Sequence, residues 1–390
     1  MPTSRATEGS LQTWHVITGE YPPQSGGVSD YVFLLAKALA EAHDEVHIWC
    51  PRYERPALEL PGVTVHGTLG RFLPADLRQT ARELDNFPAP RHLLIQWVPH
   101  AYGHRSLNVP FCLWLRNRAR RGDAIDLMVH EPYLPFKRSS LRQTVAALVH
   151  RLMTMIVLRS AKHVWISTLA WRPYLEPYAP ARPLGFDWLP VPSNVPVAGN
   201  GGEATRIRDR YAPNGLLVGH FGTYGSAIAA SLREILTGML REIPETPVLL
   251  MGGGSQRFLE DFIAKCPSAK GKIQATGRLG QMELSHHLSA CDVLIQPYPD
   301  GVSSRRTTVM AALEHGRAVV TTSGPLTESI WESSRAVALA PAGDTEAFLR
   351  SLTRLMTSNE ERIRLGDAAG ELYRSRFDML HVVDLLRAKQ

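Results

Sequence analysis

Residues 292–322, DVLIQPYPDGVSSRRTTVMAALEHGRAVVTT, decide the fold of this chain. Two short apolar runs, 292–298 and 317–322, have the composition of buried strands, and a helical pattern lies between them. Gly316 stands at the C′ position, where many helices end. Because strands joined by a single helix pair in parallel, this stretch predicts one strand–helix–strand unit of a parallel sheet.

The same alternation of strand-like runs and helical patterns recurs in both directions from this stretch. The chain has 390 residues, which is enough for two domains. Residues 191–206 concentrate Pro, Gly, Asn and Ser and predict a linker. We therefore predict two doubly wound, Rossmann-like α/β domains, residues 1–195 and 196–372, that face each other across a cleft. The further strand-like runs are 12–18, 45–50, 63–67, 92–98, 125–130, 163–167, 216–221, 246–251, 272–277 and 336–340.

Composition excludes several classes of protein. Hydrophobic residues make up 44% of the chain and charged residues 21%, which rules out wholesale disorder and a fibrous protein. The net charge of +6 suits an anionic ligand such as a nucleotide. The four cysteines form no CxxC pair, so neither a disulfide framework nor a thiolate metal site is expected. With no apolar signal segment and no long uncharged apolar run, the expected location is the cytoplasm, with the inner face of the membrane as an alternative.

The loop at 300–308 carries the strongest chemical signal. Ser303 or Ser304 is the expected N-cap of the helix that follows, which puts Arg305 and Arg306 in its first turn. Cations there oppose the helix dipole, and a guanidinium binds phosphate through two parallel hydrogen bonds. The pair therefore predicts an anion site, and the alternative is that both arginines reach a nearby carboxylate.

Three other loops follow strands of the predicted sheets. Gly26 and Gly27 precede a helix, where backbone N–H groups can approach a phosphate or sugar, although a tight turn without function explains them equally well. His130 and Glu131 stand at a strand end fixed by Pro132, and a structural histidine is the alternative there. The loop from Gly222 to Gly225 opens the second domain and suits a diphosphate.

Weaker candidates are set aside or left open. His100 and His104 are four residues apart but lack a third metal ligand, so no zinc site and no other metal site is expected. His286 and His287 fall in a helical pattern and are expected at the surface. The apolar, basic helix at 142–162 is expected to pack on its own sheet, and contact with an anionic membrane is the alternative.

The order of these motifs resembles the retaining nucleotide-sugar glycosyltransferases of family four, which have the GT-B fold. The resemblance extends over nearly the whole chain. It includes the opening GEYPPQSGGVSDYVFLLAKAL, the strand end VHEP, the linker entry LPVPSNVP, and the segments VGHFGTYG, LLMGGGS, ATGRLGQMELSHHLSACDVLIQPYPDG and MAALEHGRAVVTT. The C-terminal YRSRFDMLHVVDLLRAKQ, about 373–390, looks like the helix that in this fold crosses back to the first domain.

The resemblance implies roles for particular residues. The strand-end histidine, here His130, hydrogen-bonds the donor sugar near the reacting carbon. The glycines Gly26 and Gly27 lie near the donor diphosphate and the transferred sugar. The remaining donor-binding residues are expected to be Gly222, Thr223, Tyr224, Gly225, Arg278, Leu279, Ser303, Ser304 and Thr307, and the acceptor side is expected to include Gln96, His100, Glu131 and Tyr133.

The sequence also departs from the family. Most relatives carry two glutamates eight residues apart before the helix end, and aligning Gly316 with the family's glycine puts Ser303 and Ala311 there. A basic residue that relatives often have in the first loop of the second domain is absent from GTYGSAIAASL. We interpret Arg305 and Arg306 as the replacement for the missing positive charge. The identity of the donor sugar is left open by this departure.

The predicted function is transfer of a hexose-type sugar from a UDP- or GDP-linked donor to an acceptor hydroxyl. The mechanism is expected to be retaining and independent of a metal, because the arginines and backbone donors neutralise the diphosphate. The acceptor is a glycan, a lipid-linked molecule or a small molecule, and peripheral membrane contact is an open possibility. Two alternatives stay open: a nucleotide-sugar 2-epimerase of similar fold, and a catalytically silent nucleotide-binding scaffold.

Overall fold

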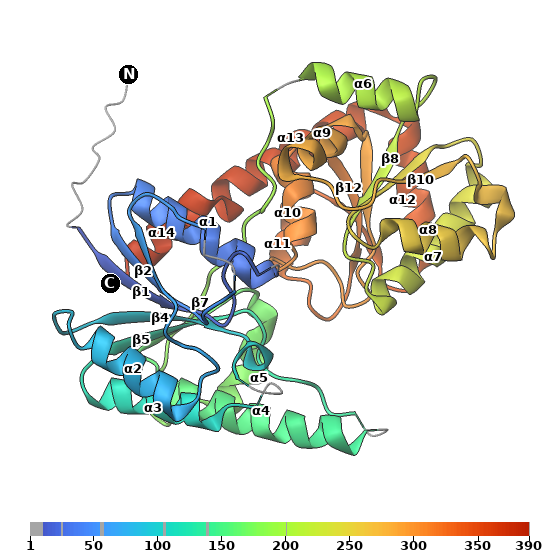
Figure 1. Ribbon diagram of the computed structural model, residues 1–390. Coiled ribbons are helices and arrows are strands. Elements are labelled where there is room, and N and C mark those ends of the chain that lie inside the picture. Colours follow the sequence, from blue (N-terminus) through green and yellow to red (C-terminus); the bar gives the residue numbers. More distant parts are fainter. Residues whose placement is uncertain are drawn as a thin grey trace. The chain divides into compact units, whose positions relative to one another are not determined.

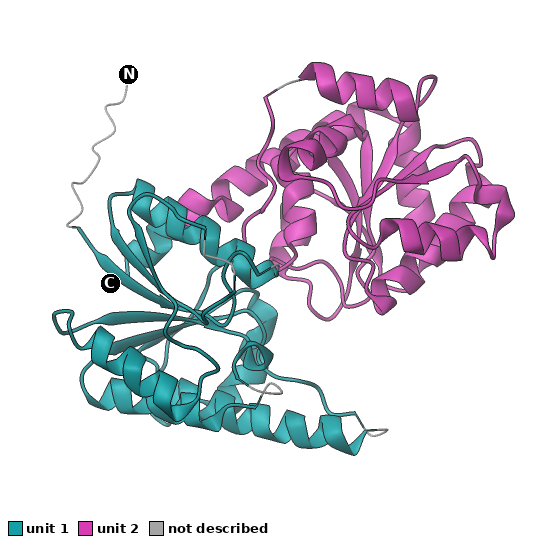
Figure 2. Cartoon of the chain, viewed as in Figure 1, with its two compact units in different colours: residues 1–189, 382–390 teal, residues 190–381 magenta. Residues whose placement is uncertain are grey.

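The computed structural model describes residues 11–389 except residues 25, 55–57, 104–106, 138–139 and 200. The chain divides into two compact units, shown in Figure 2. Unit 1 comprises residues 1–189 and 382–390, and unit 2 comprises residues 190–381. His104, one of the residues discussed above, lies outside the described residues.

Unit 1 is built on a parallel sheet that has seven strands over the described residues, in the order β3-β2-β1-β4-β5-β6-β7. Figure 1 shows α1 on one side of this sheet and α2, α3 and α4 on the other. The strands are β1 (Thr13–Ile17), β2 (Glu45–Trp49), β3 (Val63–His66), β4 (His92–Trp97), β5 (Ala124–Val129), β6 (His163–Ile166) and β7 (Phe186–Trp188). The helices are α1 (Gly27–Glu41), α2 (Pro74–Leu84), α3 (Val109–Arg120), α4 (Leu141–Ser160) and the short α5 (Arg172–Leu175).

Unit 2 repeats the plan with a parallel sheet that has six strands in the described part of the chain, in the order β10-β9-β8-β11-β12-β13. Its strands are β8 (Val218–Phe221), β9 (Val248–Met251), β10 (Ile273–Ala275), β11 (Val293–Gln296), β12 (Ala318–Ser323) and β13 (Ala338–Pro341). Its helices are α6 (Gly201–Tyr211), α7 (Ser226–Glu242), α8 (Ser255–Ile263), α9 (Gln281–Ala290), α10 (Thr307–Glu314), α11 (Ser329–Ser333), α12 (Thr345–Thr357) and α13 (Asn359–Leu372).

The chain order explains both sheets. In each unit the order reverses at the first strand, so helices after it cover opposite faces, as right-handed crossovers require. In unit 2, α12 packs on α7 while α10 packs on α13. Buried aliphatic and aromatic side chains from strands and helices, such as Val218, Phe258 and Leu352, form the core of this unit. The prediction of doubly wound parallel sheets is confirmed.

Two expectations about local structure were wrong. The predicted linker at 191–206 ends earlier, because α6 already begins at Gly201. The segment before it is fastened to unit 2: Val191 N donates to Ser304 O (3.0 Å) and Ser193 N donates to the Tyr373 hydroxyl (3.2 Å). His287, expected at the surface, is buried, and its Nδ1 lies 2.8 Å from Glu283 O.

The C-terminal segment continues from α13 through a π-helical turn (Tyr373–Phe377) into α14 (Met379–Arg387). Residues from Val382 onward belong to unit 1. There the Arg387 guanidinium donates to Ala42 O (3.3 Å) and lies 3.5 Å from Asp44 Oδ1. The end of the chain is therefore part of the first unit, although the residues before it belong to the second.

Candidate functional site

The glycine loop of unit 1 lies between β1 and α1, and its two glycines differ in their surroundings. A Cβ on Gly26 would lie 2.3 Å from Glu20 Oε2, so a larger residue there would require the Glu20 carboxylate to move. A Cβ on Gly27, the first residue of α1, would meet nothing within 4 Å. Gly26 therefore leaves room for the Glu20 carboxylate, whereas Gly27 has open space that a ligand can fill.

His130 follows β5 directly and is held on several sides. Its Nε2 lies 2.9 Å from Oε1 of Gln96 on the neighbouring strand β4. The Tyr31 ring of α1 meets the imidazole edge to face, with 5.0 Å between ring centroids. The carbonyl of His130 accepts a hydrogen bond from Trp171 Nε1 (3.0 Å). These contacts fix both the backbone and the ring at the carboxyl end of the sheet.

Burial lowers the pKa of His130 to about 3, so the imidazole is neutral at physiological pH. Gln96 is fully buried, and its carbonyl oxygen can only accept. With Oε1 facing the ring, Nε2 carries the proton and Nδ1 is left as an acceptor. The arrangement presents a neutral hydrogen-bond acceptor rather than a cation.

Two further predicted residues lie at the same edge of unit 1. His100 Nδ1 and Glu131 Oε2 are 3.6 Å apart, and both side chains are about half exposed. The loops after β1 and β4 touch here, because a Cβ on Gly19 would lie 2.4 Å from Ala101 O. Burial raises the pKa of the Glu20 carboxyl, and nearby His100 opposes that shift. Gln96, His100, His130 and Glu131 are thus gathered with the glycine loop.

Tyr133 lies in a different environment. Its hydroxyl donates to Tyr174 O (3.0 Å), and the Arg151 guanidinium stacks on its ring at 4.1 Å from the centroid. Its described contacts are therefore to α4 and the segment after β6, rather than to the residues around His130.

In unit 2, the loop from Gly222 to Gly225 joins β8 to α7. Gly222 N donates to Met251 O (3.1 Å), and the Tyr224 hydroxyl donates to the same oxygen (3.2 Å). Thr223 and Gly225 are exposed. Gly225 is the N-cap of α7, which has no side-chain cap and no acidic residue in its first turn. Free N–H groups at a helix start with no competing carboxylate form an anion site.

A second glycine loop, residues 252–254, lies between two predicted parts of the site, although we did not predict it as part of the site ourselves. Gly252 follows β9 with φ +116°, and a Cβ there would lie 2.1 Å from Gly222 O. A Cβ on Gly253 would lie 3.6 Å from Arg278 Nε. Residues 252–254 therefore lie between the Gly222 loop and Arg278. Three adjacent glycines after a strand were the signal in the sequence.

Arg278 and Leu279 follow β10. The Arg278 side chain is exposed beside the glycine loop at 252–254. Leu279 lines a pocket of about 340 Å³, together with Tyr211 of α6 and both His286 and His287 of α9. An apolar side chain, an aromatic ring and imidazoles give this pocket walls against which a planar group can stack.

The arginine loop differs from the prediction in where the helix begins. α10 starts at Thr307 with Arg306 as its N-cap, so the expectation that Ser303 or Ser304 caps it was wrong. Ser304 instead donates through its backbone N to Glu328 Oε1 (3.2 Å), and its hydroxyl also contacts that carboxylate. Ser303 is fully buried, and its Oγ has no hydrogen-bond partner among the described residues.

Arg305 and Arg306 share one carboxylate. Arg305 Nη2 lies 2.9 Å from Asp300 Oδ2, and Arg306 Nη2 lies 2.5 Å from Asp300 Oδ1. This is the arrangement named above as the alternative to an anion site. Two guanidinium groups and one carboxylate leave a net charge of +1 at the N-terminus of a helix, with about a fifth of each arginine side chain exposed. Asp300 thus holds both guanidinium groups in place, and the remaining positive charge is available to an anion.

A chain of contacts joins the arginine loop to the Gly222 loop. The Arg306 guanidinium stacks on the Tyr298 ring at 4.8 Å from the centroid. The Tyr298 hydroxyl donates to Gln296 Oε1 (3.2 Å), and Gln296 Nε2 donates to Phe221 O (3.1 Å), one residue before Gly222. Because β8 and β11 are neighbours in the sheet, the starts of α7 and α10 lie at the same edge.

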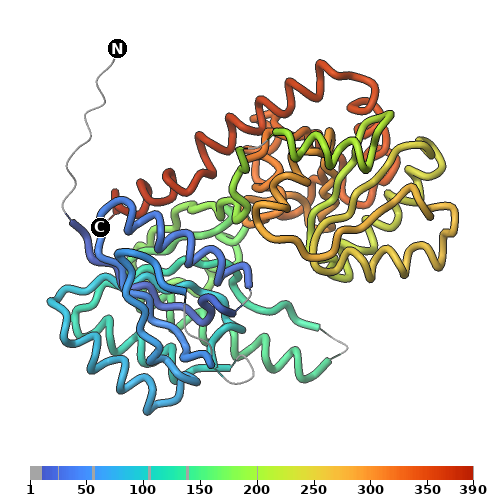
Figure 3. Tube along the Cα trace, turned by 45° about the horizontal axis from the view of Figure 1, so that its top comes forward, coloured from blue at the N-terminus to red at the C-terminus, as the bar shows by residue number. Residues whose placement is uncertain are grey.

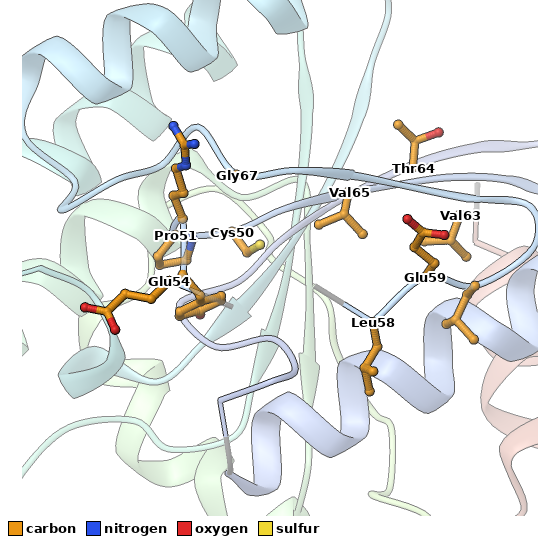
Figure 4. A pocket seen from close by; sticks show the side chains of 12 residues that line it. Cys50, Pro51, Glu54, Leu58, Glu59, Val63, Thr64, Val65 and Gly67 are labelled. Carbon is orange, nitrogen blue, oxygen red and sulfur yellow. The ribbon is translucent and has the colours of Figure 1, made fainter. Parts of the chain in front are cut away.

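A separate pocket of about 710 Å³ lies at the edge of the unit 1 sheet, beside β3 (Figure 4). Its walls include Cys50, Glu54, Glu59 and Val65, and none of the predicted site residues lines it. Tyr53, another lining residue, accepts a hydrogen bond from Tyr21 N (3.2 Å) and so connects the pocket wall to the loop after β1. Over the described residues, no group of three His, Cys, Asp or Glu side chains is placed to hold a metal.

Residues 212–358 match the family described as Glycosyl transferases group 1. Sucrose-phosphate synthase from Thermosynechococcus elongatus is similar over 97% of this chain and 99% of its own, with a TM-score of 0.72 and 16% identity. WaaG, a glycosyltransferase involved in lipopolysaccharide biosynthesis, is similar over 96% and 99%, with a TM-score of 0.67 and 14% identity. HepE from Anabaena, in complex with UDP-glucose, is similar over 97% and 98%, with a TM-score of 0.69 and 14% identity. No curated protein matches the chain.

The fold is therefore that of the GT-B glycosyltransferases. Within it, residues 212–358 of unit 2 carry a group 1 glycosyltransferase domain. The resemblance seen in the sequence is confirmed to this extent.

Proposed function

We propose that this protein is a retaining glycosyltransferase that moves a hexose from a UDP-linked donor to an acceptor hydroxyl without a metal. The observation that carries the proposal is the pair Arg305 and Arg306 on Asp300, at the start of α10 and joined through Tyr298 to the loop before α7. Two helix N-termini and a net positive charge at one sheet edge are suited to a diphosphate.

Sugar transfer requires charge stabilisation at the leaving group. As the bond between the anomeric carbon and the β-phosphate oxygen breaks, its electron pair moves to that oxygen. Arg305, Arg306 and the N–H groups at the starts of α7 and α10 stabilise the charge that develops. The acceptor oxygen bonds to the anomeric carbon on the face that the phosphate leaves, and its proton passes to the phosphate. No protein nucleophile is needed.

His130 acts on the sugar in this proposal. Its neutral ring, with Nδ1 free to accept, suits a hydrogen bond from a donor-sugar hydroxyl, which is the role that the resemblance implies. A cationic imidazole would instead disfavour the positive charge that builds on the sugar ring in the transition state. His100 and Glu131 are proposed to line the acceptor side, and the acceptor is a glycan, a lipid-linked molecule or a small molecule.

The nucleotide is proposed to be UDP. The HepE structure described above holds UDP-glucose, which supports a UDP-linked hexose in this chain. A thermal-shift panel of UDP-glucose, UDP-galactose and GDP-mannose tests this choice. We expect the melting temperature to rise most with a UDP-sugar, with EDTA present or absent. A larger rise with the GDP-sugar would overturn the nucleotide assignment, and loss of turnover in EDTA would overturn metal independence.

Incubating the sugar donor with and without an acceptor distinguishes the proposed transferase from the epimerase and from the silent scaffold. An epimerase would convert UDP-glucose to its C2 epimer in the absence of an acceptor, because it needs only a base and an acid at that carbon. A silent scaffold would bind the nucleotide but release no UDP with any acceptor. The proposal requires a stable donor without acceptor, UDP release with acceptor, and an α-linked product from an α-linked donor, seen by NMR of the anomeric proton.

A further inference from the structure

Residues 132–175 have an unusual charge distribution. They contain seven Lys and Arg residues and no Asp or Glu. Most of this segment is α4 and the loop that leads into it. A stretch of this length with cations alone carries a positive potential toward any surface that it faces.

α4 has one face in the core of unit 1 and one face in solvent. Its buried residues include Ala147, Met153 and Val157, which pack toward the sheet. The opposite face exposes four aliphatic side chains at spacings of four, three and four residues: Leu141 (81%), Val145 (48%), Leu148 (55%) and Leu152 (42%). These positions form one apolar stripe along the helix.

The first turns of α4 extend past the other elements of unit 1, as the two views in Figures 1 and 3 show. By length and composition alone, α4 is also long and apolar enough to cross a membrane, although it carries arginines and is not an uncharged run. Spanning would pull its buried face out of the unit 1 core. The helix can therefore lie on a bilayer but cannot cross one in this fold.

The loop before α4 adds a fixed aromatic side chain to the stripe. The Arg151 guanidinium stacks on the Phe136 ring at 3.8 Å from the centroid and donates to Leu134 O (3.0 Å) and Ala147 O (2.8 Å). Phe136 is nevertheless 52% exposed, and the exposed Lys137 follows it. An aromatic ring is thus held at the surface next to the exposed cation Lys137, and the exposed Arg142 follows at the start of α4.

The charge distribution decides which occupant fits the stripe. A second copy of α4 would bring two positively charged segments together, with no carboxylate in either to pair with them. A bilayer that contains anionic lipids satisfies both features, because its interface takes up the apolar side chains and its headgroups neutralise the cations.

We propose that Phe136, Lys137 and the exposed face of α4 dock this protein on an anionic lipid bilayer, with α4 parallel to the membrane plane. The docking surface comprises Phe136, Lys137, Leu141, Arg142, Val145, Leu148 and Leu152. It lies entirely in unit 1 and does not depend on the proposed sugar transfer. An experiment can therefore overturn the docking proposal without overturning the proposed enzyme activity, and the activity can fail while membrane docking is observed.

Cosedimentation of the full chain with vesicles tests the proposal. One vesicle set is pure phosphatidylcholine, and the other contains about 30 mol% phosphatidylglycerol. The apolar variant is L141S/L148S and the charge variant is K137E/R142E. Ile363 of α13 (56% exposed) and the exposed Arg257 of α8, both in unit 2, provide the matched controls I363S and R257E.

We expect binding to the anionic vesicles only, weakened by salt, and lowered at least about tenfold by either docking-surface variant but by neither control. Circular dichroism and melting curves establish that the variants fold. Equal binding to both vesicle sets, no binding, or binding unchanged in L141S/L148S would overturn the proposal. A dimer in vesicle-free solution that L141S/L148S abolishes would show instead that the stripe covers a second copy, and would overturn it as well.

Discussion

His130 Nε2 lies 2.9 Å from Gln96 Oε1, and this contact joins the ends of two neighbouring strands, β5 and β4. With the amide oxygen assigned to face the ring, Nε2 of this half-buried, neutral imidazole carries the proton, because the oxygen requires a donor. The side chain that the resemblance places at the reacting sugar therefore depends on a partner 34 residues earlier in the chain.

The contact predicts that His130 acts on the sugar directly and that Gln96 acts by positioning the imidazole. H130A should lower kcat about 100-fold, since one preorganised hydrogen bond to the reacting sugar is lost. Q96L should lower kcat about tenfold, because the imidazole loses the partner that fixes its tautomer and orientation. Steady-state kinetics and UDP titration measure both effects. UDP affinity should be unchanged in each variant, and an equal effect of Q79L, at an exposed glutamine of α2, would contradict the positioning role.

Alanine substitutions at Gly26 and Gly27 should distinguish an effect on stability from an effect on ligand binding. G26A is expected to lower the melting temperature only slightly, because the Glu20 carboxylate, 2.3 Å from the added Cβ, is the end of a flexible side chain and can move aside. G27A should raise stability by up to about 1 kcal/mol, since alanine favours the first turn of α1 and its Cβ meets nothing. If a ligand approaches Gly27 closely, G27A should still lose at least about tenfold in kcat/KM. Normal turnover in G27A would leave that glycine without a role in binding.

Buried histidines predict a steep loss of stability in acid. Burial lowers the pKa of His15 and His130 to about 3 and that of His220 and His315 to about 4, whereas in the unfolded chain each titrates near 6.5. Below about pH 6.5 the unfolded state binds protons that the native state does not, so stability falls as pH falls. Each histidine contributes about 1.4 kcal/mol per pH unit in this range.

Urea unfolding at a series of pH values measures this slope. H315Q keeps a polar partner for Ser285, whose Oγ lies 2.7 Å from His315 Nε2, and removes one of the four titrations. The slope of unfolding free energy against pH below about 6.5 should then decrease by about 1.4 kcal/mol per unit. A slope that is the same in the variant and the parent chain would show that His315 is protonated in the folded protein.

The sequence was a good guide to the fold because the alternation of strands and helices is a local pattern. The strand-like run at 292–298 became β11, and the helix end at Gly316 was correct, with φ +59° there. The strand β7 was not predicted because three residues are too few to show the alternation of apolar and polar residues typical of a strand. The linker was overextended because the glycines at its end begin α6 rather than a loop.

The site was predictable only as a set of loops. Asp300, the partner of both arginines, was in the loop that we singled out, but its pairing depends on how the chain turns before α10. The misplaced N-cap has a similar cause. Ser304 bonds to Glu328, 24 residues further on, and this long-range contact outweighs the local preference of serine for helix starts.

The arginine pair is the centre of the account, and nucleotide binding tests it most directly. Isothermal titration of UDP should be measured for the parent chain, R306A, R305A/R306A and the control R350A, at an exposed arginine of α12. Loss of charge-assisted hydrogen bonds to a diphosphate, at about 1.5–3 kcal/mol, should weaken UDP binding of R306A by roughly 10- to 150-fold, and R350A should match the parent. UDP affinity that is unchanged in the folded double variant would mean that Asp300 is the only partner the arginines have, and the proposed donor site would be wrong.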